Sequence, residues 1–346
     1  MTTDLLAPTN KDTEPKRDRY GRYLILPPTG NKPIAYTRAT TIAKTLDDTY
    51  NLEQWKLRTA AKGIASRPDL IARIATTTPD DKTTLNNLCA DALTAGQADS
   101  GANLGTALHT ATEHHDRGQA LDQLPDTMKA DIDAYAAAMR AHGIVTYPHW
   151  IEKTVVDDTN KIAGTFDRIV QLPTGELVIA DLKTGQDLSW SWPGIAVQLA
   201  IYANANAIYN HATHTRTELP ADLDKTIGLV IHLPAGKARC TLHTIDLIEG
   251  HRALGLSLQT RAWRSHKHLA HEYRPTLEDD ATHHRAPLIA RLAQIKKENP
   301  AALRDLASRW PAHIATFKQT DVHTVAECVE IDALISEIET LYSISF

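Results

Sequence analysis

Two aspartates and a lysine near the middle of the chain have the residue types and spacing that suit chemistry on a phosphate. Asp167 closes the stretch Gly-Thr-Phe-Asp, and the triplet Asp181-Leu-Lys183 follows it. Clustered carboxylates suit Mg²⁺ or Mn²⁺ better than Zn²⁺, because hard cations prefer oxygen ligands. A divalent cation there would polarise a phosphate and lower the pKa of a bound water. A neighbouring lysine would orient that water or stabilise charge that develops on the phosphate.

A β-hairpin is predicted to bring the two aspartates together. Residues 172–175, Leu-Pro-Thr-Gly, form a turn signal between two apolar-rich runs at 163–172 and 176–183. If the loop is centred near position 174, facing residues have numbers that add up to about 348, as those of Asp167 and Asp181 do. We expect these carboxylates within roughly 5–8 Å of each other if they share a face. Lys183 should point to the same side as Asp181. The plainer alternative is a hairpin with acid–lysine salt bridges on its surface.

A helix is predicted over residues 192–209, directly after the hairpin. Pro193 suits its first turn. Small and apolar residues form one face that could pack on a sheet, namely Ala196, Leu199, Ala200, Ala203 and Ala207. Gln198 and Tyr202 are four residues apart and therefore share a face. The ordinary interpretation of such a tyrosine is a packed residue whose hydroxyl is hydrogen-bonded.

In this order and at this spacing, Gly-x-x-Asp, Asp-x-Lys and Gln-x-x-x-Tyr resemble the RecB-like branch of the PD-(D/E)XK nuclease superfamily. That branch also carries a histidine on a preceding helix, which the stretch Gly105-Thr-Ala-Leu-His109 resembles. Its first core strand often carries a glutamate, and Trp150-Ile-Glu152-Lys-Thr-Val is similar to that strand. The resemblance covers about residues 100–250.

The resemblance implies a role for each matching residue. It implies that one or two Mg²⁺ or Mn²⁺ ions are bound by His109, Asp167, Asp181 and the backbone carbonyl of Leu182. It implies that Lys183 is the catalytic lysine beside the two aspartates. Gln198 and Tyr202 would support the site or contact DNA. Glu113 shares the helical face of His109 and is a reserve ligand or a hydrogen-bond acceptor for a ligand.

Cysteines and nucleotide-binding motifs limit the cofactors. The three cysteines, Cys89, Cys240 and Cys328, are too few for the four-cysteine iron–sulfur cluster that some RecB-like nucleases hold. The chain lacks a Gly-x-x-x-x-Gly-Lys-Ser/Thr loop, so we expect no ATP site, and any helicase would be a separate partner. Histidines at 266, 268, 283 and 284 have no neighbouring cysteines, which favours a solvated linker over a zinc site.

Composition indicates an ordinary globular protein with 42% hydrophobic and 23% charged residues. The net charge of −5 shows no overall basic bias, so nucleic-acid binding would depend on local basic clusters and on bound cations. No apolar run reaches the roughly 18–20 residues that span a bilayer. Because the N-terminus lacks the features of a signal peptide, we expect a cytoplasmic protein, from a bacterial cell or encoded by a phage.

The predicted organisation has a disordered tail at 1–19, a nuclease domain at 20–270, and a linker with a C-terminal helical module at 271–346. Within the nuclease domain, residues 38–143 should be mainly helical and residues 144–270 should form the core. A second apolar hairpin is predicted at 226–233 and 238–247, followed by a long helix at 248–269. The expected fold is α/β, a restriction-endonuclease-like core with a mixed central sheet flanked by helices.

These observations favour a metal-dependent DNA nuclease, a phosphodiester hydrolase that acts as an exonuclease in phage or bacterial recombination or repair. Its partners would be DNA and a recombination or helicase protein, and no membrane. One alternative is a non-catalytic protein on a nuclease fold that binds DNA or a partner. Another is an RNA-directed nuclease, because the same site chemistry cleaves either backbone.

Overall fold

The structure, a computed structural model, describes residues 15–96, 100–121, 124–267, 269–270, 282–314, 317 and 323–344. The chain separates into two units, Met1–Arg261 and Ala262–Phe346. Most of the predicted N-terminal tail, His268 and the linker segment 271–281 lie outside the described residues. Among the residues that are described, no helix is long and apolar enough to cross a membrane.

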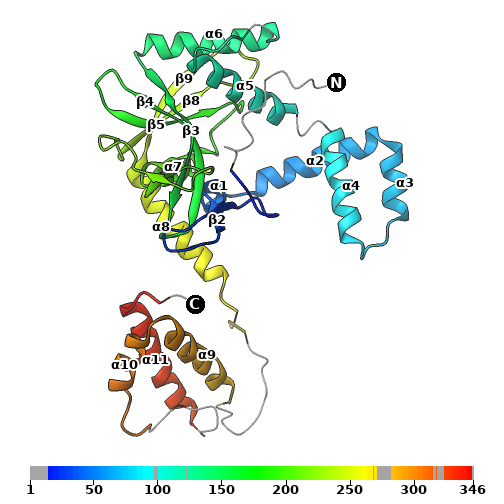
Figure 1. The fold of residues 1–346 in the computed structure, drawn as a ribbon. Helices are drawn as coiled ribbons and strands as arrows, with labels where there is room; N and C mark the ends of the chain where they lie inside the picture. The colour runs from blue at the N-terminus through cyan, green and yellow to red at the C-terminus, as the bar shows by residue number, and fades with distance from the viewer. Residues whose placement is uncertain are drawn as a thin grey trace. The chain divides into compact units, whose positions relative to one another are not determined.

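The first unit is an α/β structure built on a mixed central sheet (Figure 1). Its strands are β1 (Tyr23–Ile25), β2 (Ile34–Arg38), β3 (Val145–Asp157), β4 (Ile162–Gln171), β5 (Leu177–Lys183), β6 (Ala207–Tyr209), β7 (Arg216–Thr217), β8 (Ile227–His232) and β9 (Thr241–Asp246). The main order is β7-β6-β3-β4-β5-β8-β9, and the β1–β2 hairpin joins through β2. The sheet is mixed because β2 pairs with β4, and β5 with β8, in parallel.

Helices cover both faces of this sheet, and three further helices form a cluster of their own. They are α1 (Ala39–Ala43), the short 3₁₀ helix η1 (Lys44–Leu46), α2 (Tyr50–Ser66), α3 (Pro68–Thr76), α4 (Lys82–Ala95), α5 (Ser100–Asp116), α6 (Asp126–Ala141), α7 (Trp192–Ala203) and α8 (Leu247–Arg264). Helices α1 and α7 share one buried cluster with the sheet, and α5 and α6 share a second. Helices α2, α3 and α4 pack around Leu70, Leu88 and Ala92.

Both hairpins lie where the sequence predicts them, but the two helices predicted after them end earlier than expected. The helix predicted at 192–209 ends at Ala203, with Asn204 as its C-cap. Ala207, predicted on the packing face of that helix, instead lies in β6 and pairs with Val156 of β3. The later helix ends at Arg264 rather than at residue 269. Strand β6, which lies between β7 and β3, replaces the last predicted turns of α7, so sheet pairing overrides local helix propensity.

The second unit contains three helices among its described residues. They are α9 (Thr282–Glu298), α10 (Pro300–Ser308) and α11 (Val325–Leu341). Their apolar residues form one cluster, which includes Ile331, Ile335 and Ile338 of α11. Thr324 and Glu327 form a capping box at the start of α11, which satisfies backbone donors at that helix end.

Candidate active site

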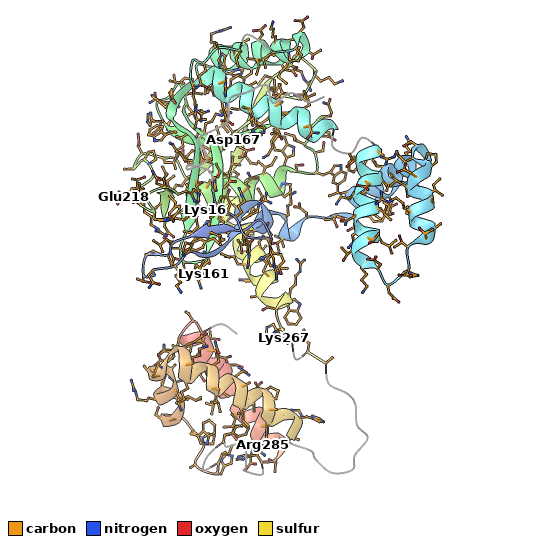
Figure 2. All side chains as sticks on the ribbon, turned by 45° about the vertical axis from the view of Figure 1, so that its right-hand side comes forward. Lys16, Lys161, Asp167, Glu218, Lys267 and Arg285 are labelled. Atoms are coloured by element: carbon orange, nitrogen blue, oxygen red, sulfur yellow. The ribbon has the colours of Figure 1, made fainter. Side chains whose placement is uncertain are left out.

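The pairing of β4 with β5 has the register that the sequence predicts. Arg168 faces Ala180 and Gln171 faces Leu177, so facing residue numbers add up to 348. The ladder stops at Arg168 and Ala180, although both strands continue. At the next step the backbone N–H of Leu182 donates to Oδ2 of Asp167 at 2.7 Å. The Asp167 side chain (Figure 2) therefore bonds β5 beyond the last paired residues.

The alternation of side chains along β4 is interrupted at Asp167. Phe166 packs in the cluster that contains α7, whereas Arg168 bonds residues of α5 and α6. Residues two apart in a regular strand point to the same face. On β3, the register shifts between Thr146 and Ile151, and Glu152 adopts a positive φ of 54°. A positive φ is uncommon for a residue other than glycine. Such a break in strand register is typical of a β-bulge, and β-bulges often change the direction of side chains beside active sites.

Asp181 and Lys183 form an ion pair at the end of β5. Lys183 Nζ lies 2.5 Å from Oδ2 of Asp181, and the two side chains are 25% and 3% exposed. Burial, together with the charge of Asp167, raises the pKa of Asp181 to about 6, although Lys183 opposes this shift. Burial disfavours the Lys183 cation, but Asp181 and Asp167 outweigh it and raise the pKa of Lys183. Lys183 thus stays charged, and it lies on the same side as Asp181, as predicted.

Helix α7 contacts the pair through Gln198. Its Nε2 group donates to Oδ1 of Asp181 at 3.2 Å and to the hydroxyl of Tyr202 at 3.1 Å. Tyr202 is 2% exposed, and burial with the nearby Asp181 raises its pKa well above the ordinary value. Gly164 makes room for this ring, because a Cβ there would lie 2.5 Å from Cε1 of Tyr202.

Helix α5 brings the predicted histidine to the same place. Nδ1 of His109 lies 3.4 Å from Oδ2 of Asp167, and the two side chains are 30% and 13% exposed. Glu113, one turn later, is paired with Arg117 at 2.9 Å. Helix α5 therefore carries an imidazole beside Asp167 and a carboxylate that Arg117, directly after the helix, already neutralises.

Glu152 belongs to the same electrostatic cluster. The residue as a whole is exposed, and its carboxyl group interacts with the charges of the site. Desolvation of that group, followed by the charges of Asp167 and Glu113, raises the pKa of Glu152 to about 9. Burial is the largest cause of this shift, and the neighbouring negative charges add a repulsion that a bound cation or a proton would relieve.

The donor atoms suit a hard divalent cation held by few protein ligands. Among the described residues, no three His, Cys, Asp or Glu side chains form a ready ligand cage. Mg²⁺ keeps several waters and is often bound by one or two carboxylates plus substrate phosphates. Oδ2 of Asp181 is buried and meets no donor in good hydrogen-bond geometry within the described part of the chain, despite the short contact to Lys183. The backbone N–H of Leu182 donates to Asp167. The Leu182 carbonyl stays a predicted ligand of the cation.

A buried network beside Asp167 was not predicted. The guanidinium of Arg168 contacts Asp116, Tyr135 and Thr112 on helices α5 and α6. The only sequence signal is an arginine inside the apolar run that follows Asp167. Local pattern does not reveal its partners, because they lie 33 to 56 positions away in the chain.

No protein-family model matches this chain, and the search of curated proteins found no significant match.

Proposed function

We propose that this protein is a Mg²⁺- or Mn²⁺-dependent deoxyribonuclease of the RecB-like PD-(D/E)XK type. One observation carries the proposal. Asp167 on β4 hydrogen-bonds to β5 one residue beyond Asp181, and Asp181 is paired with Lys183. Gln198 and His109, both implied by the same resemblance, contact these two aspartates from separate helices.

In this proposal, Asp181, Asp167, His109 and the Leu182 carbonyl hold the cation. When bound, a divalent cation supplies Lewis-acid polarisation of the phosphate and a more acidic water. The pKa of about 6 leaves Asp181 mostly ionised at neutral pH, so its oxygen is ready to act as a ligand.

The chain's other side chains then position the reaction. Lys183 is charged, and its side chain is one-quarter exposed, so it can meet a phosphate oxygen or a water that enters from solvent. Gln198 fixes the orientation of Asp181 through Oδ1, which leaves Oδ2 directed toward Lys183. His109 borders Asp167 on the α5 side. Together these contacts hold the acid pair before any ligand arrives.

The resemblance also supports an exonuclease role in bacterial or phage recombination or repair. A helicase, if one takes part, would be a separate protein, because this chain lacks a phosphate-binding loop. With a net charge of −5, few phosphates would be neutralised by side chains overall, so DNA binding should depend weakly on salt.

A cleavage assay tests the proposal. Purified protein is incubated with end-labelled linear DNA, circular DNA and single-stranded RNA across a Mg²⁺ and Mn²⁺ series. The proposal expects metal-dependent cleavage of DNA that Asp181→Asn abolishes and Asp133→Asn, an exposed matched change on α6, leaves intact. Linear-only cleavage supports an exonuclease, and cleavage of RNA alone favours the RNA-directed alternative. No cleavage of any substrate, with Asp181→Asn identical to the parent, favours the non-catalytic binding protein.

A further inference from the structure

The network around Arg168 contains a fully buried charge next to a candidate metal ligand. The side chains of Arg168 and Asp116 are 0% and 3% exposed. Nη1 of Arg168 donates to Oδ2 of Asp116 at 2.8 Å and to the hydroxyl of Tyr135 at 2.5 Å. The Tyr135 hydroxyl in turn donates to Oδ2 of Asp116 at 2.8 Å. The guanidinium therefore sits in a closed triangle of partners between β4, α5 and α6.

A second branch of the network leads to His109. Nη2 of Arg168 donates to Oγ1 of Thr112 at 3.1 Å, and this hydroxyl donates to the backbone carbonyl of His109 at 2.8 Å. The His109 imidazole lies 3.4 Å from Asp167, the residue that precedes Arg168 in the chain. The contacts thus form a ring that starts at Asp167, passes through Arg168, Thr112 and His109, and returns to Asp167.

Stability alone does not explain an ion pair at this place. Burying a guanidinium and a carboxylate has a large desolvation cost, and well-packed apolar residues of similar volume are often equally stable or better. The pair nevertheless occupies the sheet face that Leu108, Val170 and Leu182 otherwise make apolar. The pair instead supplies directional bonding. The planar guanidinium of Arg168 has donors in fixed directions, so it fixes the positions of the acceptor groups on α5 and α6.

We propose that Arg168 is a positioning residue that fixes helix α5 to strand β4, so that His109 is held beside Asp167. This inference rests on the proposed function for its catalytic consequence. The Arg168 guanidinium is buried and bonds residues of α5 and α6, so it acts through Thr112 and His109 and not on a substrate. Loss of the ring should leave the fold and the acid pair in place but allow α5 to shift relative to Asp167.

Three variants test the inference. Thr112→Val removes only the hydroxyl that links Arg168 to His109. The double variant Arg168→Met with Asp116→Leu removes both buried charges, because removing one alone would leave the other unpaired and could prevent folding. The matched control is Arg216→Met with Asp158→Leu. That pair is another Arg–Asp–Tyr network, in which Arg216 and Tyr36 bond Asp158 directly after β3.

The expected result is a loss of positioning without a loss of fold. Thr112→Val and the Arg168 double variant should keep a cooperative thermal transition. They should bind Mn²⁺ about tenfold or more weakly by calorimetry and should lower kcat by a similar factor, with KM for DNA within about twofold of the parent. Amides of α5 should exchange hydrogen faster in these variants and not in the control.

Unchanged Mn²⁺ affinity, kcat and α5 exchange in a folded double variant would overturn the inference. If that variant does not fold, Thr112→Val decides by the same measurements. Failure of the proposed function gives a different result, because the parent protein itself would cleave no DNA. In that case, the rate of hydrogen exchange at the α5 amides of the variants would still test whether Arg168 positions α5, because this measurement does not depend on activity.

Discussion

Oδ2 of Asp167 accepts the backbone N–H of Leu182 at 2.7 Å, so a side chain bonds the neighbouring strand just beyond the last paired residues of β4 and β5. This bond fixes the carboxylate of Asp167 one residue from Asp181 on the neighbouring strand. Charge-assisted bonds of this kind are shorter and stronger than neutral ones. The same oxygen faces His109, so one carboxylate links β4, β5 and α5.

Substitution of Asp167 should separate its structural role from its chemical one. Asp167→Asn retains an oxygen that can accept the Leu182 N–H, so the free energy of unfolding should stay within about 1 kcal/mol of the parent. Asp167→Ala leaves that buried N–H unsatisfied and should cost about 1–3 kcal/mol. Both variants should lose cleavage by about a thousandfold or more. Urea denaturation measures the unfolding free energies, and the cleavage assay measures activity. Equal unfolding free energies for Asp167→Asn and Asp167→Ala would argue against a structural role for the bond to the Leu182 N–H.

Lys183 and Asp181 should be energetically coupled. Lys183→Met leaves the buried carboxylate without its cation, which should destabilise the protein, whereas adding Asp181→Asn removes the unpaired charge. We expect a coupling free energy between the two changes of about 1–3 kcal/mol in a double-mutant cycle measured by denaturation. Cleavage by Lys183→Met alone should fall by about 10²–10³. Additive effects on stability would contradict the ion pair.

Gln198 should matter to activity through the orientation of Asp181. Gln198→Ala removes the donor to Oδ1 of Asp181 and should lower kcat by about 10–100-fold. Tyr202→Phe leaves that bond in place and removes only the second contact of the amide, so its effect should be smaller. Steady-state kinetics with saturating Mn²⁺ would measure both, and a larger effect for Tyr202→Phe would assign the tyrosine a direct role.

Gly164 should tolerate no side chain. A Cβ at this position would lie 2.5 Å from Cε1 of Tyr202 and 2.9 Å from Cβ of Ala39. Gly164→Ala should therefore cost about 1–3 kcal/mol and reduce cleavage, because α7 must move away from the sheet. Gly255→Ala is the matched control, since nothing lies within 4 Å of its Cβ and the residue is helical. That change should stabilise the protein by up to about 1 kcal/mol.

His211 should make stability depend on pH below neutrality. Burial, then the charges of His214 and Arg17, lowers its pKa from 6.5 to about 4. The ring also contacts Thr154 and Tyr209. Between these pKa values the unfolded chain binds more protons than the folded one, so stability is full above pH 6.5 and falls as the pH drops toward 4. Because the ring is partly exposed, the loss should be about 1 kcal/mol.

The variant His211→Gln isolates this contribution. It keeps a polar group near Thr154 but cannot take up a proton in this range. The difference in unfolding free energy between pH 7.5 and pH 5 should be smaller in the variant than in the parent. An unchanged difference would show that other groups carry the pH dependence.

Local sequence patterns were sufficient to predict the register of the hairpin that carries the two aspartates and the place of Lys183 beside Asp181. The turn at 172–175 set the register of β4 and β5, because side chains alternate with a period of two and a tight loop fixes which residues face each other. The same alternation placed Lys183 beside Asp181, and the four-residue spacing placed Gln198 beside Tyr202. Each of these relationships spans one turn or one element, so short-range geometry determines it.

Long-range contacts decided the rest. The end of α7 at Ala203 follows from the pairing of β6 with β3, and the change of face in β4 after Phe166 follows from helices packed on opposite sides of the sheet. The partners of Arg168 come from two helices distant in the chain. A pattern of residue types records which side chains prefer burial. Only the folded chain determines which buried donor meets which acceptor, because that choice depends on the packing of every element around it.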